Sequence, residues 1–371
     1  MVEVLVVASN SIVRHPRIHK IVESLKKKYL TTVLGWNREG ISLNETQGYL
    51  VDLSLLQFRA PFGRPSLIFY YPIFWTWIFI KLLQFRPKVV HAIDLDTLFP
   101  CCVYKFLFRK KLLFDVHDRF GGYVPQNYTT LHSTINLLEE LLCKQANVLV
   151  TVSEKVQDTF RSRPKYCAVI TNFSEDYEFE KVRSEDGYLT LVYTGLITKD
   201  QGLEKIASAI ADLNGVQLVI AGRVVDKELL DQMLKLNNIQ YRGLLKRPDS
   251  LRLEASSDVM MVLYDLQYRK NKLSSPNKVF EAMMCGIPLI TNMESELVHN
   301  EVGCGIIVDF NETNQIKQAI IFLRDNPEIR RKMGENGRKA FEEKYNWNLM
   351  EEKLYEIYNN LMHEEHSSDN P

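Results

Sequence analysis

Short apolar runs alternate with amphipathic segments throughout the first half of the chain. Apolar runs predict buried strands at residues 2–8, 31–34, 89–91, 111–115, 147–153 and 166–170. Between them, the pattern predicts helices from residue 17 to about 28 and over residues 135–146. Nearly continuous apolar strands separated by helices are typical of a parallel sheet covered on both faces, so the pattern predicts an α/β fold.

A polar, acidic stretch at residues 174–187 interrupts this alternation and is typical of a linker between domains. The alternation then restarts, with predicted strands at 189–194, 217–221, 259–263 and 289–291 and predicted helices at 203–213 and 312–324. We therefore expect two Rossmann-like domains, residues 1–173 and 188–345, joined by the linker 174–187. A terminal helix and a polar tail are expected over residues 346–371.

Composition excludes some classes of protein. The chain has 371 residues, enough for two hydrophobic cores, and its 46 basic residues balance 46 acidic ones. This balance argues against bulk nucleic-acid binding, which normally needs a basic excess. The six cysteines are scattered without a C-x-x-C pair, which favours a reducing cytoplasm. The first eight residues lack a basic leader and predict a strand rather than a signal peptide.

Residues 65–85 are almost continuously apolar and aromatic, and they are nearly long enough to span a bilayer. Pro72 and Lys81 interrupt the segment, and the strand and helix pattern continues on both sides, which argues against a span. Two interpretations stay open: a buried helix of the first domain, or a helix whose aromatic side chains lie in the membrane interface. We favour partial burial with peripheral contact at the inner face of the membrane.

The most informative stretch is residues 272–290, which predicts a loop, a helix, a tight turn and a short strand. Val279, Ala282 and Met283 share one helical face, Gly286 ends the helix, and Pro288 prevents its continuation. The purely structural interpretation is an ordinary amphipathic helix with charged residues on its surface.

The functional interpretation of this stretch is a phosphate-binding site at the start of the helix. N–H groups in the first turn of a helix lack intrahelical partners and carry partial positive charge, so the junction Ser275, Pro276 and Asn277 suits a phosphate. Lys278 adds a full charge, and Glu281 lies one turn further on, where a carboxylate could accept two ribose hydroxyls.

Residues 278–290 resemble the nucleotide-sugar segment of retaining glycosyltransferases of family four. Their sequence is Lys-Val-Phe-Glu-Ala-Met-Met-Cys-Gly-Ile-Pro-Leu-Ile. The resemblance implies the two-domain GT-B fold, in which two Rossmann-like domains face each other across a cleft. It also implies that the helix N-terminus holds the diphosphate and that Glu281 holds the ribose. Many relatives carry a second glutamate two helical turns earlier, where this chain has Leu273. Trp347 matches an aromatic that precedes a terminal helix returning to the first domain.

The segment from Tyr193 to Glu204 is similar to the first turn of the second domain in that family, where cations touch the donor diphosphate. Leu196 and Gln201 occupy the usual positions of these cations, so Lys199 and, at the end of the next strand, Arg223 are the candidates here. Gly195 lets the backbone approach a phosphate closely.

In the first domain, two motifs are also similar to those of a subset of the family: His-x-x-Asp-x-Asp at residues 91–96 and Phe-Asp-x-His-Asp at residues 114–118. The resemblance implies that His117 lies beside the transferred sugar and helps to shape the reacting centre. Arg14, Arg17 and Asp94 follow predicted strands at the same sheet edge, where open α/β sheets bind ligands, and are candidates for the acceptor or a phosphate. We interpret Asp94-Leu-Asp96 as loop and helix-cap chemistry rather than as a metal site.

The resemblance thus implies transfer of a sugar from a nucleotide diphosphate-sugar to a saccharide or lipid-linked acceptor, with no metal or other cofactor. We expect a cytoplasmic enzyme of surface polysaccharide assembly. Two alternatives stay open: a nucleotide-sugar epimerase of the same fold, and a non-catalytic sugar-nucleotide-binding or scaffold protein, for which Leu273, Leu196 and Gln201 are the best support.

Overall fold

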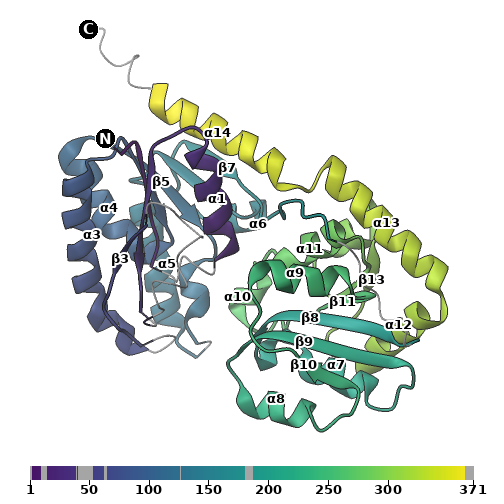
Figure 1. Ribbon diagram of the computed structural model, residues 1–371. Helices are drawn as coiled ribbons and strands as arrows, with labels where there is room; N and C mark the ends of the chain where they lie inside the picture. Colours follow the sequence, from purple (N-terminus) through teal and green to yellow (C-terminus); the bar gives the residue numbers. More distant parts are fainter. Residues whose placement is uncertain are drawn as a thin grey trace. The chain divides into compact units, whose positions relative to one another are not determined.

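The computed structural model describes residues 2–9, 15–38, 40, 53–61, 65–125, 127–179 and 187–363. The chain divides into two compact units: residues 1–171 with 350–371, and residues 172–349. Each unit is built on one parallel sheet with helices on its faces, as the alternating sequence pattern predicts (Figure 1).

The sheet of the first unit has the strand order β3-β2-β1-β4-β5-β6-β7, and every pair of neighbours is parallel. Its strands are β1 (Val4–Val7), β2 (Thr31–Trp36), β3 (Leu53–Leu56), β4 (Val89–Ile93), β5 (Lys111–Val116), β6 (Val148–Thr151) and β7 (Tyr166–Val169). The order reverses between β1 and β4, so the carboxyl ends of these strands form the edge at which open α/β sheets bind ligands.

Helices cover both faces of this sheet: α1 (Pro16–Lys26), α3 (Tyr71–Phe85), α4 (Leu95–Phe108), α5 (Thr129–Cys143), α6 (Glu154–Gln157) and α14 (Trp347–His363). Figure 1 shows α3 and α4 along one side of the sheet and α1 along the other. The terminal helix α14 joins the first unit from Met350 onward and packs against α1, where the hydroxyl of Tyr355 donates to the carbonyl of Ser24 at 2.9 Å. The prediction that the terminal helix returns to the first domain is therefore confirmed.

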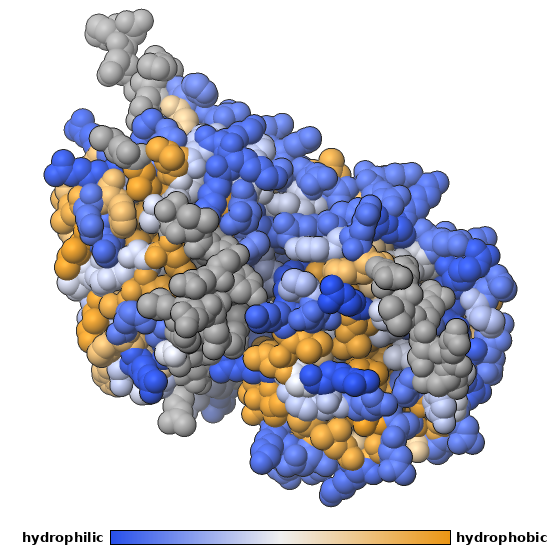
Figure 2. Space-filling view, viewed as in Figure 1, coloured by the Kyte–Doolittle hydropathy of each residue, from blue (hydrophilic) through white to orange (hydrophobic). Residues whose placement is uncertain are grey.

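The apolar segment at 65–85 folds as a 3-10 turn, η2 (Pro65–Tyr70), followed by α3. Phe74, Ile78 and Leu82 are fully buried, and the Phe74 ring stacks on Trp36 of β2 with 4.7 Å between ring centroids. Residues 66–85 have the length and composition of a membrane span, yet one face packs on the sheet. Figure 2 shows apolar side chains at the margin of the first unit, where Figure 1 places α3. The helix is thus partly buried and leaves an apolar outer face.

The sheet of the second unit has the order β10-β9-β8-β11-β12-β13 and is also parallel. Its strands are β8 (Leu189–Ile197), β9 (Val216–Val224), β10 (Ile239–Tyr241), β11 (Val259–Val262), β12 (Leu289–Thr291) and β13 (Gly305–Ile307). Its helices are α7 (Leu203–Ile210), α8 (Lys227–Met233), α9 (Arg247–Ala255), α10 (Arg269–Lys272), α11 (Asn277–Cys285), α12 (Thr313–Asp325) and α13 (Pro327–Glu343). Short turns of helix lie at Phe120–Tyr123 in the first unit and at Lys199–Gln201 and Glu296–Glu301 in the second.

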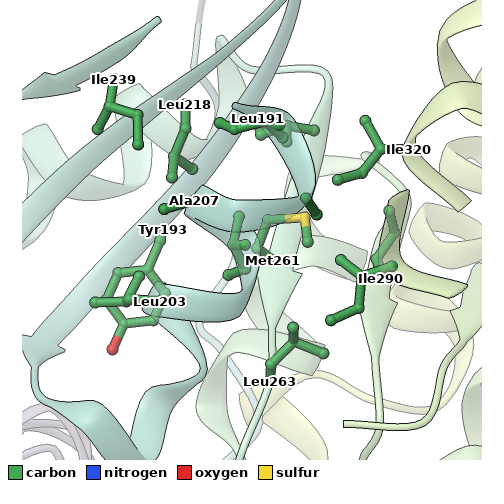
Figure 3. Packing of buried hydrophobic residues seen from close by; sticks show 14 of the residues in the cluster. Leu191, Tyr193, Leu203, Ala207, Leu218, Ile239, Met261, Leu263, Ile290 and Ile320 are labelled. Atoms are coloured by element: carbon green, nitrogen blue, oxygen red, sulfur yellow. The ribbon is translucent and has the colours of Figure 1, made fainter. Parts of the chain in front are cut away.

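Aliphatic side chains from the strands and from α7 and α12 form the core of the second unit. Figure 3 shows Leu191 of β8, Leu218 of β9 and Met261 of β11 packed with Leu203 and other residues of this cluster. This core holds the ends of β8 and β11 in fixed positions, and the strand order reverses between these two strands.

The structure departs from the sequence pattern in a few places. β8 and β9 extend three residues beyond their predicted ends, and β3 and β10 were not predicted. Of the predicted linker 174–187, residues 180–186 lie outside the described part. Ser174 is buried in the second unit, where it pairs with Asn346 and its carbonyl accepts from the Trp347 N–H at 2.9 Å.

Candidate active site

The loop, helix, turn and strand predicted at residues 272–290 are confirmed. Pro276 has extended backbone angles and precedes α11, which ends at Gly286 with a φ of 63°. Only glycine adopts this left-handed conformation without strain, and the Ile287 N–H donates to the Ala282 carbonyl at 3.1 Å to close the turn. The first turn of α11 is therefore presented at the carboxyl edge of the sheet, as a phosphate site requires.

Lys278 lies at the centre of a polar cluster in the second unit. Its Nζ donates to Thr194 Oγ1 at 2.6 Å and lies 3.4 Å from Glu281 Oε2. A Cβ placed on Gly195 would lie 3.4 Å from Lys278 Cε, so the lysine side chain passes beside this glycine. Three of the predicted donor-binding residues, Gly195, Lys278 and Glu281, thus come together.

Arg247 and Glu254 of helix α9 complete this cluster, although neither was a candidate from the sequence. Arg247 Nη1 donates to Glu281 Oε1 at 2.8 Å, so this buried carboxylate has a cation near each oxygen. Glu254 is buried, accepts a hydrogen bond from the Thr194 hydroxyl, and lies 3.7 Å from Lys278 Nζ. Burial first, and then the nearby Glu281 carboxylate, raise the pKa of Glu254 to about 7, although Lys278 opposes the shift.

Gly195 and Gly222 are paired on neighbouring strands, and their close approach shapes this edge of the sheet. Gly222 has a φ of 140°, and a Cβ there would lie 1.8 Å from the Gly195 carbonyl oxygen. Gly195 has a φ of 149°, which an L side chain rarely adopts. The geometry requires glycine at both positions. Because Gly195 has no side chain, a ligand can approach its backbone closely.

The other predicted donor contacts are less closely associated with this cluster. Lys199 is 63% exposed at its side chain, and its Nζ lies 4.0 Å from Asp226. Arg223 is the second-last residue of β9, opposite Leu196, and so lies near the end of this strand. Ser275 lies in the loop before α11, and the buried Oδ1 of Asn277 has no hydrogen-bond partner among the described residues.

In the first unit, His117 directly follows β5 at the carboxyl edge of the sheet and is buried. Its Nε2 lies 3.4 Å from Asp115 Oδ2, and its backbone N–H donates to Asp94 Oδ1 at 3.0 Å. Burial lowers the pKa of His117, although the Asp115 carboxylate opposes the shift. The imidazole is therefore mostly neutral at pH 7, so one ring nitrogen can donate and the other can accept a hydrogen bond.

Arg17 and Asp94 both have partners within the first unit. Arg17, a candidate for the acceptor or a phosphate, is 1% exposed, and its guanidinium donates to both oxygens of Asp115, at 2.8 and 3.2 Å, so its charge is paired within the first unit. Asp94 does not cap α4 with its side chain, because its carboxylate accepts from His117 instead. Arg14 lies outside the described residues.

Asp94 has a φ of 59°, an uncommon conformation for a residue with a side chain. Burial, together with the neighbouring Asp96, raises the pKa of Asp94 well above its usual range. Asp96 accepts hydrogen bonds from Ser9 and from the hydroxyl of Tyr71, the latter at 3.2 Å. Among the described residues, no group of three or more His, Cys, Asp or Glu side chains has the geometry to hold a metal ion.

His15 is a further residue at this edge that sequence reasoning missed. Its ring stacks on His117 with 4.8 Å between centroids, and its buried Nδ1 has no hydrogen-bond partner within the described part of the chain. Burial, followed by the neighbouring His117, lowers the pKa of His15 from 6.5 to about 3. The available signal in the sequence was a histidine in the loop after the first predicted strand. Its contact with His117 could not be predicted, because the sequence does not show which loops meet at the edge of the sheet.

Comparison with known proteins agrees with this geometry. A family model described as glycosyl transferases group 1 matches residues 174–340, and one described as glycosyltransferase family 4 matches residues 21–173. The two parallel α/β units have the GT-B fold, and both family models describe glycosyltransferases. The chain belongs to the family-four glycosyltransferases and is a glycosyltransferase.

Named relatives include an uncharacterized glycosyltransferase of Methanocaldococcus jannaschii, 24% identical over 302 residues that cover 72% of this chain and 73% of the relative. The capsular polysaccharide biosynthesis glycosyltransferase CapM of Staphylococcus aureus is 22% identical, over 51% of this chain and 53% of CapM. The chain thus matches about half the length of CapM. Anabaena HepE, solved in complex with UDP and glucose, has a TM-score of 0.71 at 12% identity and covers 97% of this chain and 100% of its own. This last likeness shows the shared fold.

Proposed function

We propose that this enzyme transfers a sugar from a nucleotide diphosphate-sugar to a lipid-linked saccharide at the inner face of the membrane, with retention of configuration, during surface polysaccharide assembly. The cluster of Gly195, Lys278 and Glu281 carries this proposal. At one edge of the sheet, it combines the backbone of Gly195, which has no side chain to block a ligand, with the ammonium of Lys278 in the first turn of α11 and the carboxylate of Glu281. These are the groups that a ribose and a diphosphate need.

In this proposal Lys278 stabilises the negative charge that develops on the departing diphosphate. It takes the place of the two cations whose usual positions hold Leu196 and Gln201, since its side chain lies beside Gly195. Electrostatic stabilisation of the leaving group is then the chief catalytic effect. A lysine and helix N–H groups can supply it, so we propose that transfer needs no metal and continues in EDTA.

Glu281 is proposed to accept the ribose hydroxyls, held in place by Arg247. His117 is proposed to contact the transferred sugar as a neutral imidazole, held in place by Asp115 and Asp94. Arg17 contributes by keeping the Asp115 carboxylate ionised and oriented. The names of relatives support the class of donor and product: HepE is solved with UDP and glucose, and CapM is named for capsular polysaccharide biosynthesis.

The test is a nucleotide-release assay with UDP-, GDP- and ADP-sugars, with and without a membrane lipid extract as the source of acceptor. We expect release from one donor class, strongly stimulated by the extract, together with a radiolabelled sugar in the lipid fraction. His117→Ala should abolish transfer while leaving the nucleotide-induced rise in melting temperature intact. Glu281→Gln should weaken both, because it changes the ribose contact.

Other outcomes would contradict the proposal. An epimer of the donor sugar formed without acceptor would indicate the epimerase. Nucleotide binding without transfer from any donor would indicate a binding or scaffold protein. Label appearing only in a soluble saccharide would contradict the lipid-linked acceptor, and loss of transfer in EDTA would contradict metal-independent chemistry.

A further inference from the structure

The outward face of α3 and η2 is unusually apolar for a helix of a water-soluble unit. The inner residues Phe74, Ile78 and Leu82 are buried, but large apolar side chains also face outward. Those exposed are Ile68, Phe69, Ile73, Ile80 and Leu83, of which Phe69 is 80% exposed. A contiguous patch of this kind marks an interaction site rather than an ordinary surface.

Helix α4 extends this apolar face. It packs beside α3, where the Trp75 and Phe99 rings lie 5.1 Å apart between centroids and the Trp75 Nε1 donates to the Asp96 carbonyl at 2.7 Å. At its other end, three consecutive apolar residues of α4 are exposed, Phe106, Leu107 and Phe108, and Phe106 is 84% exposed. An aromatic side chain that is so exposed at a helix end gains little from the fold itself.

Helix α5 completes the face on the far side of α4. The two helices are joined by a hydrogen bond from Cys102 Sγ to the Leu142 carbonyl at 3.7 Å and by one from Lys105 Nζ to the Gln145 carbonyl. The exposed apolar residues of α5 are Leu131, Leu137, Leu138 and Leu141. The outer faces of α3, α4 and α5 therefore form one layer, which we call the three-helix face.

The charges of the three-helix face are mostly positive. Residues 65–86, 95–110 and 129–146 contain the cations Lys81, Arg86, Lys105, Arg109, Lys110 and Lys144. Their acids are Asp96, Glu139 and Glu140, and each is occupied: Asp96 by Ser9 and Tyr71, and both glutamates by Arg119. Apolar side chains bordered by an excess of cations over acids match an interface of lipid chains and anionic headgroups.

We propose that the three-helix face is the surface with which this enzyme docks on an anionic bilayer, with the exposed end of α4 at Phe106–Phe108 as a second insertion point besides α3. The proposal deepens the proposed function and rests on it for the bilayer as partner. A second copy of the chain fits less well, because a two-fold interface would pack two faces of the same positive charge against each other.

Docking through this face would place the acceptor edge near the lipid. The Tyr71 hydroxyl and the Trp75 indole, both on α3, donate to Asp96, which lies two residues after Asp94 at the carboxyl edge of the sheet. Asp94 in turn accepts from His117. The apolar face thus leads directly to the residues proposed to receive the acceptor, so a lipid-linked saccharide could arrive without leaving the membrane.

The test is co-sedimentation of the full-length protein with phosphatidylcholine vesicles that contain or lack phosphatidylglycerol. We expect binding only to the anionic vesicles, weakened by high salt. Phe106→Glu/Leu107→Glu on α4 and Phe69→Glu/Ile80→Glu on the α3 segment should each lower the affinity by at least about tenfold. Arg109→Gln/Lys110→Gln should lower it by roughly fivefold for each cation removed.

Phe322→Glu is the matched control, because Phe322 is likewise an exposed aromatic but lies on α12 of the second unit. It should bind vesicles like the wild type, and thermal unfolding checks that every variant is folded. Wild-type affinity of the α4 variant, equal binding to neutral vesicles, or a dimer in solution that Phe106→Glu dissociates would overturn the proposal.

The same variants separate this proposal from the proposed function. The α4 variant should keep the nucleotide-induced rise in melting temperature while it loses vesicle binding. Vesicle binding without any nucleotide effect in the wild type would contradict the proposed function alone. A nucleotide effect without vesicle binding would contradict the docking face alone.

Discussion

The Nζ of Lys278 lies 3.4 Å from Oε2 of Glu281, one turn further along α11. The same ammonium group donates to Thr194 within β8, one residue before Gly195. A single lysine thus joins the helix that begins at the proposed phosphate site to the strand that carries Gly195. This relationship places the charge for the diphosphate and the carboxylate for the ribose in one connected network.

The first prediction concerns which cation binds the diphosphate. Lys278→Met should lower the affinity for a nucleoside diphosphate by roughly 10- to 100-fold, because it removes a charged hydrogen bond, and should change nucleoside affinity little. Lys199→Met is the control, since Lys199 is exposed and lies near Asp226. Calorimetric titration measures both. A larger effect at Lys199 than at Lys278 would contradict the assignment.

The second prediction concerns the close approach of β8 and β9. Gly222→Ala should destabilise the second unit strongly, since its Cβ would overlap the Gly195 carbonyl oxygen. Gly243→Ala separates overlap from backbone strain, because Gly243 also has a positive φ, 78°, but has no atom within 4 Å of the added Cβ. We expect a loss of about 1–2 kcal/mol for Gly243→Ala and a clearly larger one for Gly222→Ala, both from denaturant unfolding. Equal losses would show that the contact is not rigid.

The third prediction concerns the buried ion pair of Arg17 and Asp115. Asp115→Asn should destabilise the first unit by about 3–5 kcal/mol, because it leaves a buried guanidinium without its counter-charge. Arg17→Met/Asp115→Asn should lose less than the sum of the two single changes. Glu335→Gln, which breaks an exposed pair with Arg331, should change stability by less than about 1 kcal/mol. Additive losses at Arg17 and Asp115 would contradict a direct pair.

The fourth prediction concerns the pH dependence that His15 confers. Because its pKa is about 3 in the folded protein, below the unfolded value of 6.5, the folded state binds fewer protons between these values. The free energy of unfolding should therefore decrease as pH falls below 6.5, by about 1.4 kcal/mol at pH 5.5 from this residue. His15→Phe keeps a ring against His117 but cannot titrate, so its stability should decrease less between pH 7 and 5.5. Parallel pH profiles for the two proteins would contradict this account.

The sequence predicted most of the fold, because the central strands of both sheets are buried on two faces and are therefore recognisable as apolar runs. β10 was missed since its three residues include Gln240 and Tyr241 and resemble a loop. β8 and β9 were predicted too short because Gly195 and Gly222 are typical of turns in sequence, whereas here they sit opposite each other within paired strands.

The candidate site was predictable only where its residues are close in sequence. Lys278 and Glu281 are three residues apart on one helix, so their meeting follows from helical geometry. Arg247 and Glu254 reach the same carboxylate and ammonium from α9, which shares no recognisable motif with α11. Arg17 was considered as an acceptor or phosphate contact because nothing in its sequence neighbourhood reveals its partner Asp115, 98 residues away.

The most direct test of the central claim is the melting temperature of the wild type and Glu281→Gln with UDP, GDP and ADP. We predict that one diphosphate raises the wild-type melting temperature by mass action and that Glu281→Gln loses most of this rise. Glu343→Gln, an exposed glutamate on α13, should retain it. If no diphosphate stabilised the wild type, or if Glu281→Gln responded like Glu343→Gln, the proposed donor site would be wrong.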